Sequence, residues 1–117
     1  MCDDASQLSE FARTGSEPAF RQLVARHFDL VHATALRRVN GDRSLAQELA
    51  QTVFTDLARQ ARTLPTDTIL AGWLYRHTCF QAAEAIRANR RRIAREHAAA
   101  LMHSIERSGH DADWEQI

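Results

Sequence analysis

The stretch SLAQELAQTVFTDLARQA, residues 44–61, decides the fold class. Its apolar side chains recur at steps of three and four residues, a spacing that gathers them along one face of an α-helix. That face carries Leu45, Leu49, Val53, Leu57 and Ala61, with Phe54 beside it. Polar and charged residues fill the other face, so we predict an amphipathic helix that buries one side. Ser44, with Gln47 three residues on, predicts a capping box at its start.

Two further helices are predicted before this one. A short helix covers residues 5–14 or so, and Gly15-Ser16 separates it from a second helix. The second helix has an apolar stripe at the same spacing, made of Phe20, Leu23, Val24, Phe28, Val31, Ala35 and Val39. Asn40-Gly41-Asp42 then stops this helix and turns the chain.

A long fourth helix follows a break in the pattern. Pro65 cannot continue a helix and favours an extended residue before it, so a loop at 62–68 separates the third and fourth helices. One of the polar residues 66–68 is expected to cap the fourth helix, which runs to about residue 106 and ends at Ser108-Gly109. The chain is therefore predicted to be all-α, a compact bundle of about four helices of which the last is long.

Two faces of the fourth helix carry different side chains. One is predicted to face the core and consists of Leu74, Tyr75, Thr78, Cys79, Ala82, Ala85, Ile86 and Ile93. The other interleaves rings and guanidinium groups: Trp73, Arg76, Phe80, Arg87 and Arg91, with Arg90 and Arg95 at its flanks. Guanidinium groups bind phosphates and exposed rings stack on unpaired bases, so this face indicates single-stranded nucleic acid. The pattern is equally compatible with Trp73 and Phe80 in the core and the arginines in solvent.

The charges are distributed unevenly along the 117 residues. Fifteen arginines, with no lysine, balance fifteen acidic residues, and the formal net charge is zero. Residues 76–95 nevertheless carry six arginines and one glutamate, whereas residues 96–117 carry five acidic residues and one arginine. Arg binds phosphate bidentately and stacks on bases, so the basic segment permits a nucleic-acid partner despite the balanced total.

Several other classes of protein find no support in the sequence. The two cysteines make no disulfide framework, and no apolar run is long enough to span a membrane. Asp3 and Asp4 stand where a secretory signal needs positive charge, so we expect a cytoplasmic protein. The spacings of the six histidines predict no metal site, and no glycine-rich phosphate loop or nucleophile motif occurs. We expect no enzymatic activity, metal or cofactor.

Three motifs within residues 6–95 resemble motifs of one protein family, and they occur in the same order and at the same spacing as in that family. Residues 17–32, EPAFRQLVARHFDLVH, resemble the opening helices of bacterial sigma factors of the extracytoplasmic-function type. Residues 46–54, AQELAQTVF, resemble the next helix of that family, and residues 71–76, AGWLYR, match its Trp-Leu-Tyr-Arg signature. The basic segment 87–95 is similar to the end of the same helix. The resemblance implies a sigma region 2 domain, which binds core RNA polymerase and opens the −10 promoter element.

The resemblance also implies roles for individual residues. In the family, one helix presents acidic and amide side chains to the clamp helices of the polymerase β′ subunit. Its positions here are Gln47, Glu48, Gln51, Thr52 and Thr55. The loop 62–68 resembles the loop that captures a flipped base, through Arg62, Thr66, Asp67 and Thr68. The helix that contacts the non-template strand corresponds to Trp73, Arg76, His77, Phe80, Arg87, Arg90, Arg91 and Arg95, with Phe80 in place of a common Asn.

The ends of the predicted domain also follow from the resemblance. Residues 1–107 form the region 2-like domain, and the acidic residues 108–117 read as the start of an interdomain linker. The family's second domain, which binds the −35 element, has no counterpart in this sequence, so we expect the N-terminal half of a sigma factor. An anti-sigma factor is a further partner of the kind that this family has. One alternative stays open: a helical protein–protein interaction module, regulatory or dimeric, that binds no DNA.

Overall fold

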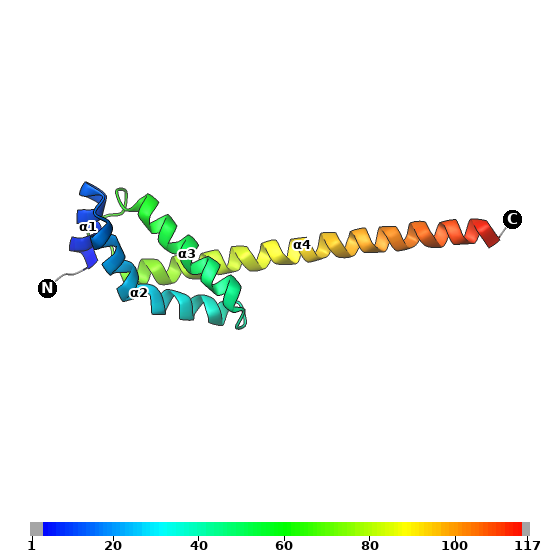
Figure 1. Cartoon of the computed structure of the whole chain (residues 1–117), viewed down its shortest axis with the longest axis horizontal. Helices are drawn as coiled ribbons and strands as arrows, with labels where there is room; N and C mark the ends of the chain where they lie inside the picture. The colour runs from blue at the N-terminus through cyan, green and yellow to red at the C-terminus, as the bar shows by residue number, and fades with distance from the viewer. Residues whose placement is uncertain (1–3, 116–117) are drawn as a thin grey trace. The chain divides into compact units, whose positions relative to one another are not determined.

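The computed structural model describes the backbone of residues 4–115 and the side chains of residues 4–107. Over that range the chain is helical, with α1 (Asp4–Thr14), α2 (Glu17–Arg38), α3 (Arg43–Gln60) and α4 (Leu70–Glu115) in succession (Figure 1). The prediction of an all-α fold with four helices, the last one long, is confirmed. The chain divides into two compact units, residues 1–84 and residues 85–117, so α4 contributes to both.

Local sequence signals explain the breaks between the first three helices. α1 ends before Gly15, whose φ of 71° lies in the left-handed region that glycine adopts without strain. Ser16 caps α2, and its hydroxyl oxygen accepts a hydrogen bond from the Ala19 N–H at 3.4 Å. Asn40 and Gly41, with φ of 56° and 82°, turn the chain between α2 and α3. The predicted breaks at both places are confirmed.

The predicted capping box of α3 is wrong. α3 begins at Arg43, and its cap is Asp42, whose carboxylate accepts a hydrogen bond from the Leu45 N–H at 3.1 Å. Asp42 has the extended backbone that suits a cap, with φ −72° and ψ 99°. Ser44 consequently lies inside the first turn, where it no longer has the cap position.

The two predicted ends of α4 are wrong as well. None of residues 66–68 caps this helix, because it begins at Leu70 and the Ile69 carbonyl accepts the first helical hydrogen bond, from the Trp73 N–H. At the other end the helix passes through Ser108-Gly109 and continues to Glu115. A glycine in a helix interior costs about 1 kcal/mol relative to alanine, which does not stop a helix unless a proline or another breaker follows. Residues 1–3 and 116–117 of the predicted domain and linker lie outside the described residues.

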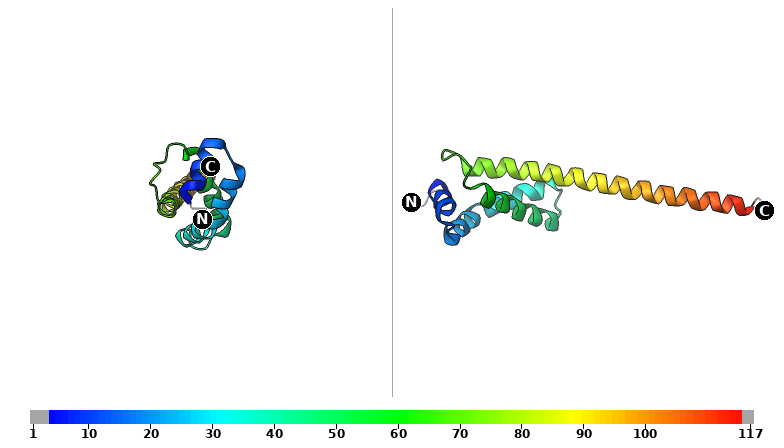
Figure 2. Two further views of the ribbon diagram at one scale, coloured as in Figure 1. Left: turned by 90° about the vertical axis from the view of Figure 1, so that its left-hand side faces the viewer. Right: turned by 90° about the horizontal axis from the view of Figure 1, so that it is seen from above.

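Residues 1–84 enclose one hydrophobic core. α2 packs along α3, α1 packs on α2, and the first turns of α4 complete the unit (Figure 2). Its largest fully buried apolar side chains are Leu23 and Val31 of α2, Val53 and Leu57 of α3, and Leu74 of α4. Burying a side chain of this size stabilises a fold by about 1.5–3 kcal/mol. The spacing of apolar residues in 44–61 therefore predicts correctly which side of α3 faces the core.

Some residues of the predicted core faces are exposed. On α4 the predicted face is buried at Leu74, Thr78 and Ala82, whereas Tyr75 and Ile93 are exposed. On α2 the ring of Phe28 is exposed and stacks on His32 with centroids 5.5 Å apart, while His27 is buried. The buried stripe of α2 thus passes through position 27, and Phe28 lies at its edge.

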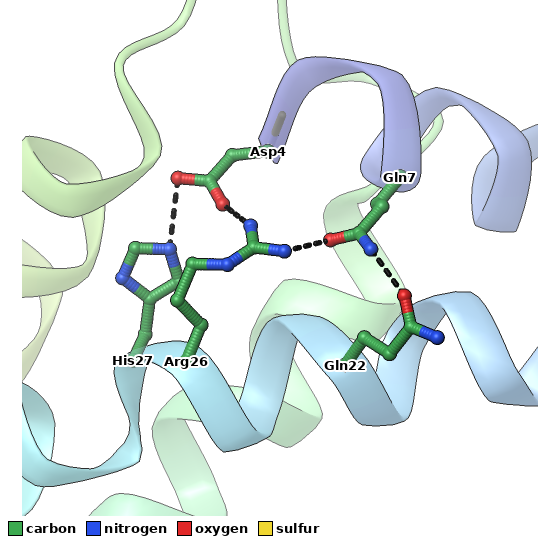
Figure 3. A network of polar contacts seen from close by, with 5 residues as sticks. All are labelled: Asp4, Gln7, Gln22, Arg26 and His27. Atoms are coloured by element: carbon green, nitrogen blue, oxygen red, sulfur yellow. Dashed lines mark hydrogen bonds and ion pairs between the residues drawn. The ribbon is translucent and has the colours of Figure 1, made fainter. Parts of the chain in front are cut away.

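A polar network fastens α1 to α2 (Figure 3). Asp4 forms an ion pair with Arg26, and its Oδ2 accepts a hydrogen bond from His27 Nε2 at 2.8 Å. Arg26 also donates to Gln7 at 2.6 Å, and Gln7 donates to Gln22. Because an ionised carboxylate can only accept, the Nε2–H of His27 is the donor. These directional contacts fix the place at which α1 lies on α2.

Candidate functional site

The exposed face of α3 carries all five residues predicted to bind RNA polymerase. We call this set the polar α3 face: Gln47, Glu48, Gln51, Thr52 and Thr55. Four of them, together with Asp56 and Arg59, line an open hollow, and Gln47 is exposed on the same helix. The Thr52 hydroxyl donates to the Glu48 carbonyl at 3.0 Å, so its hydrogen is used within the helix. The structure therefore brings these residues together on one accessible helix face.

Three rings stack along the first turns of α4, and we call them the ring ladder: Trp73, His77 and Phe80. The centroids of Trp73 and His77 are 4.6 Å apart with planes at 12°, and those of His77 and Phe80 are 6.3 Å apart with planes at 27°. Trp73 is half-buried and packs against the core, whereas Phe80 is 56% exposed. The sequence left open whether Trp73 and Phe80 lie in the core or on the surface. In the structure Trp73 packs against the core, whereas Phe80 faces solvent.

Asp56 holds the middle ring of the ladder. Its Oδ2 accepts hydrogen bonds from His77 Nε2 at 2.8 Å and from Gln81 Nε2 at 3.2 Å. The side chains of His77 and Asp56 are only 18% and 21% exposed. Neither Asp56 nor Gln81 was predicted from the sequence as a site residue. The available signal is the spacing of four between His77 and Gln81, which places both side chains on one helix face toward a shared partner.

The loop between α3 and α4 lies against α1 (Figure 1). Arg62 donates from Nε to the Ala12 carbonyl at 3.2 Å, which joins residues fifty positions apart in the chain. Arg62, Thr66 and Thr68 line a cleft together with residues of α1. Asp67 is exposed, so the four loop residues predicted to contact DNA are near one another without all lining the cleft. The contact of Arg62 with α1 was not predicted from the sequence.

The predicted DNA-binding arginines beyond residue 84 are exposed. This holds for Arg87, Arg90, Arg91 and Arg95, which belong to the second unit, residues 85–117. Their neighbour Arg92 pairs with Glu96 at 3.3 Å and donates to Asn89 at 2.6 Å. Arg76 is exposed in the first unit, and it stands three residues after Trp73 and four before Phe80. That spacing places Arg76 on the same helix face as the ring ladder.

Tyr75, in the Trp-Leu-Tyr-Arg motif, contacts the end of α2. A hydrogen bond with the Tyr75 side chain, helped by the nearby Cys79 thiol, raises the pKa of the Arg38 guanidinium above its ordinary value.

Among the residues that the structure describes, no group of three or more histidine, cysteine, aspartate or glutamate side chains is arranged to hold a metal ion. In the same part of the chain, no helix has both the length and the apolar character needed to cross a bilayer. Comparison with protein-family models, with curated proteins and with solved structures found no match for this chain.

Proposed function

We propose that this chain is a transcription initiation domain similar to sigma region 2. In this proposal the polar α3 face binds the β′ clamp helices of core RNA polymerase, and α4 with the loop at 62–68 holds unpaired bases of the −10 element. The observation that carries the proposal is the ring ladder, whose outermost ring, Phe80, is 56% exposed beside Arg76. The Trp-Leu-Tyr-Arg motif at residues 73–76 also supports it.

The polar α3 face supports the docking part of the proposal. Its carboxylate at Glu48 and its amides at Gln47 and Gln51 suit the guanidinium groups of a basic coiled coil. The hollow beside them gives partner side chains room to enter. Because all five residues are exposed, docking requires no rearrangement of the core.

The ring ladder supports the DNA part. Each base that stacks on an aromatic ring contributes about 1–3 kcal/mol to the binding of a single strand, whatever its sequence. Phe80 offers its ring to a base, and the rings of His77 and Trp73 continue the stack toward the core. Arg76 on the same face, and separately the exposed arginines of residues 85–107, supply positive charge for phosphates.

The proposal assigns no catalytic group to this chain, because RNA polymerase carries out the chemistry. The chain would act in the cytoplasm, where polymerase and promoter DNA meet, and an anti-sigma factor would compete for the same surfaces. In this proposal the chain positions the polymerase on the promoter and holds the opened DNA.

The test uses bacterial core RNA polymerase mixed with the chain and a fluorescein-labelled single-stranded oligonucleotide. The substitution Phe80→Ala should weaken oligonucleotide binding about tenfold, since one stacked base is lost. Phe28→Ala is the matched control because Phe28 is an exposed ring on α2, and it should bind like the unchanged chain. Equal binding by the Phe80→Ala chain would refute the assignment of the ring ladder.

The salt dependence of oligonucleotide binding tests the role of the arginines of the second unit. Arg91→Ala combined with Arg95→Ala should reduce the slope of log affinity against log salt by about 1.4, because each phosphate contact contributes about 0.7 on a single strand. An unchanged slope would remove these arginines from the DNA interface.

One observation favours a second candidate, a helical protein–protein interaction module. Ile93, Leu101, Met102 and Ile105 of the second unit are more than half exposed, and the spacing of four between Leu101 and Ile105 places these two on one helix face. A module of this kind would self-associate or bind another protein without DNA. Sedimentation of the chain alone tests the self-associating form of this module, which predicts a dimer that Leu101→Glu dissociates.

A further inference from the structure

We infer that Asp56 is a positioning residue for the ring ladder and that it acts through His77. This inference rests on the proposed function and extends it to a residue that neither the motifs nor the resemblance indicated. Asp56 stands on α3, whereas the ladder stands on α4, and the carboxylate joins the two helices. Its role would be to keep the ladder in the stacked arrangement to which a nucleobase can be added.

The hydrogen bonds of Asp56 fix the plane of the His77 ring. Nε2 of His77 donates to Asp56 Oδ2 at 2.8 Å, and Gln81 donates to the same oxygen at 3.2 Å. A histidine ring otherwise rotates about two side-chain torsions, and the bond removes that freedom in a site that is mostly closed to solvent. Gln81, one helical turn beyond His77, holds the carboxylate in place.

The plane of His77 decides whether the three rings form one stack. Its plane lies 12° from that of Trp73 and 27° from that of Phe80, so a single orientation serves both neighbours. A rotated His77 would separate Phe80 from Trp73 and leave the exposed ring without support from the core. The ring that meets a base would then have to be ordered during binding, at a cost in side-chain entropy.

The position of Asp56 also explains why its role needs a specific test. It lines the hollow of the polar α3 face beside Thr52 and Thr55. An effect of replacing Asp56 could therefore come from polymerase docking instead of from the ladder. Affinity for polymerase and affinity for the oligonucleotide must be measured separately.

The main experiment measures both affinities for the whole 117-residue chain with core RNA polymerase and the labelled oligonucleotide. Asp56→Ala should weaken oligonucleotide binding about tenfold, because the released rings must be ordered again during binding, with polymerase affinity unchanged. Asp56→Asn retains an acceptor for His77 and should recover most of the binding. Asp29→Ala, which removes an exposed carboxylate of α2, is the control and should have no effect. A loss of polymerase affinity in Asp56→Ala, or equal effects of Asp56→Ala and Asp29→Ala, would overturn the inference.

A double-mutant cycle tests whether Asp56 acts through His77. His77→Phe keeps a ring in the stack and needs no hydrogen bond. In that background Asp56→Ala should have no further effect on oligonucleotide binding. If Asp56→Ala still weakens binding about tenfold in the His77→Phe chain, Asp56 acts by another route and the inference is wrong.

A measurement without polymerase separates this inference from the proposed function. In a chain with Trp114→Phe, Trp73 is the remaining tryptophan, and its fluorescence reports the ring stacked on it. Asp56→Ala should change this emission, and Asp29→Ala should not. Failure of the unchanged chain to bind polymerase would refute the proposed function, and a changed emission would still support Asp56 as the residue that positions the ladder. An unchanged emission would overturn the inference whatever polymerase does.

Discussion

Replacing Asp4 by alanine should loosen α1 from α2 and lower the stability of the first unit. Asp4 accepts a hydrogen bond from His27, whose side chain is 10% exposed, and forms an ion pair with the more exposed Arg26. A hydrogen bond to a charged group contributes about 1.5–3 kcal/mol, and a half-exposed ion pair contributes about 0–1 kcal/mol. Allowing for the partial exposure of the carboxylate, we expect a loss of about 1.5 kcal/mol.

The assay is thermal unfolding followed by circular dichroism. For a unit of this size a loss of about 1.5 kcal/mol lowers Tm by about 6–12 °C. Glu10→Ala is the matched control, since Glu10 is exposed on the same helix, and such a surface change shifts stability by about 0.5 kcal/mol or less. A cycle with Arg26→Ala separates the ion pair from any effect of the Asp4 charge on the start of α1. Equal Tm values for Asp4→Ala and Glu10→Ala would refute the role given to the network.

Three further substitutions test the fold. Asp42→Ala should cost about 1 kcal/mol and Ser44→Ala only a few tenths, because Asp42 caps α3; urea unfolding of both variants checks this, and the reverse order would restore Ser44 as the cap. Leu57→Ala should cost about 3 kcal/mol, because Leu57 is fully buried in the core; a cost under about 1 kcal/mol, like that of a surface change, would mean that the core is packed differently.

Periodicity and turn chemistry predict most of the fold. The spacing of apolar residues in 44–61 predicts which face of α3 is buried, and Gly15 and Gly41 stand where the chain needs positive φ. The caps are harder to predict, because Asp42 and Ser44 are both good capping residues and the choice depends on the backbone that precedes the helix. Gly109 shows the same difficulty, since a weak helix former ends a helix only where other interactions favour the break.

The candidate site could be predicted in part. The resemblance to sigma factors indicates the residues of the polar α3 face and His77, whereas helical spacing alone places Trp73, Arg76 and Phe80 on one face of α4. The bond between Asp56 and His77 could not be predicted, because it depends on how α3 lies against α4. The same holds for Arg62 and Ala12, which are fifty residues apart. Contacts between helices require the packing of the core, and local patterns do not contain that information.

The most direct test of the central claim is the affinity of this chain for bacterial core RNA polymerase, measured by fluorescence anisotropy of the labelled chain. We predict saturable binding that Glu48→Arg with Gln51→Ala weakens at least about tenfold, because the reversed charge faces a basic partner and costs at least about 1.4 kcal/mol. Glu10→Arg makes the same charge change on α1 and should leave the affinity unchanged. Absence of binding by the unchanged chain, or equal affinities for all three chains, would contradict the proposal that α3 docks on polymerase.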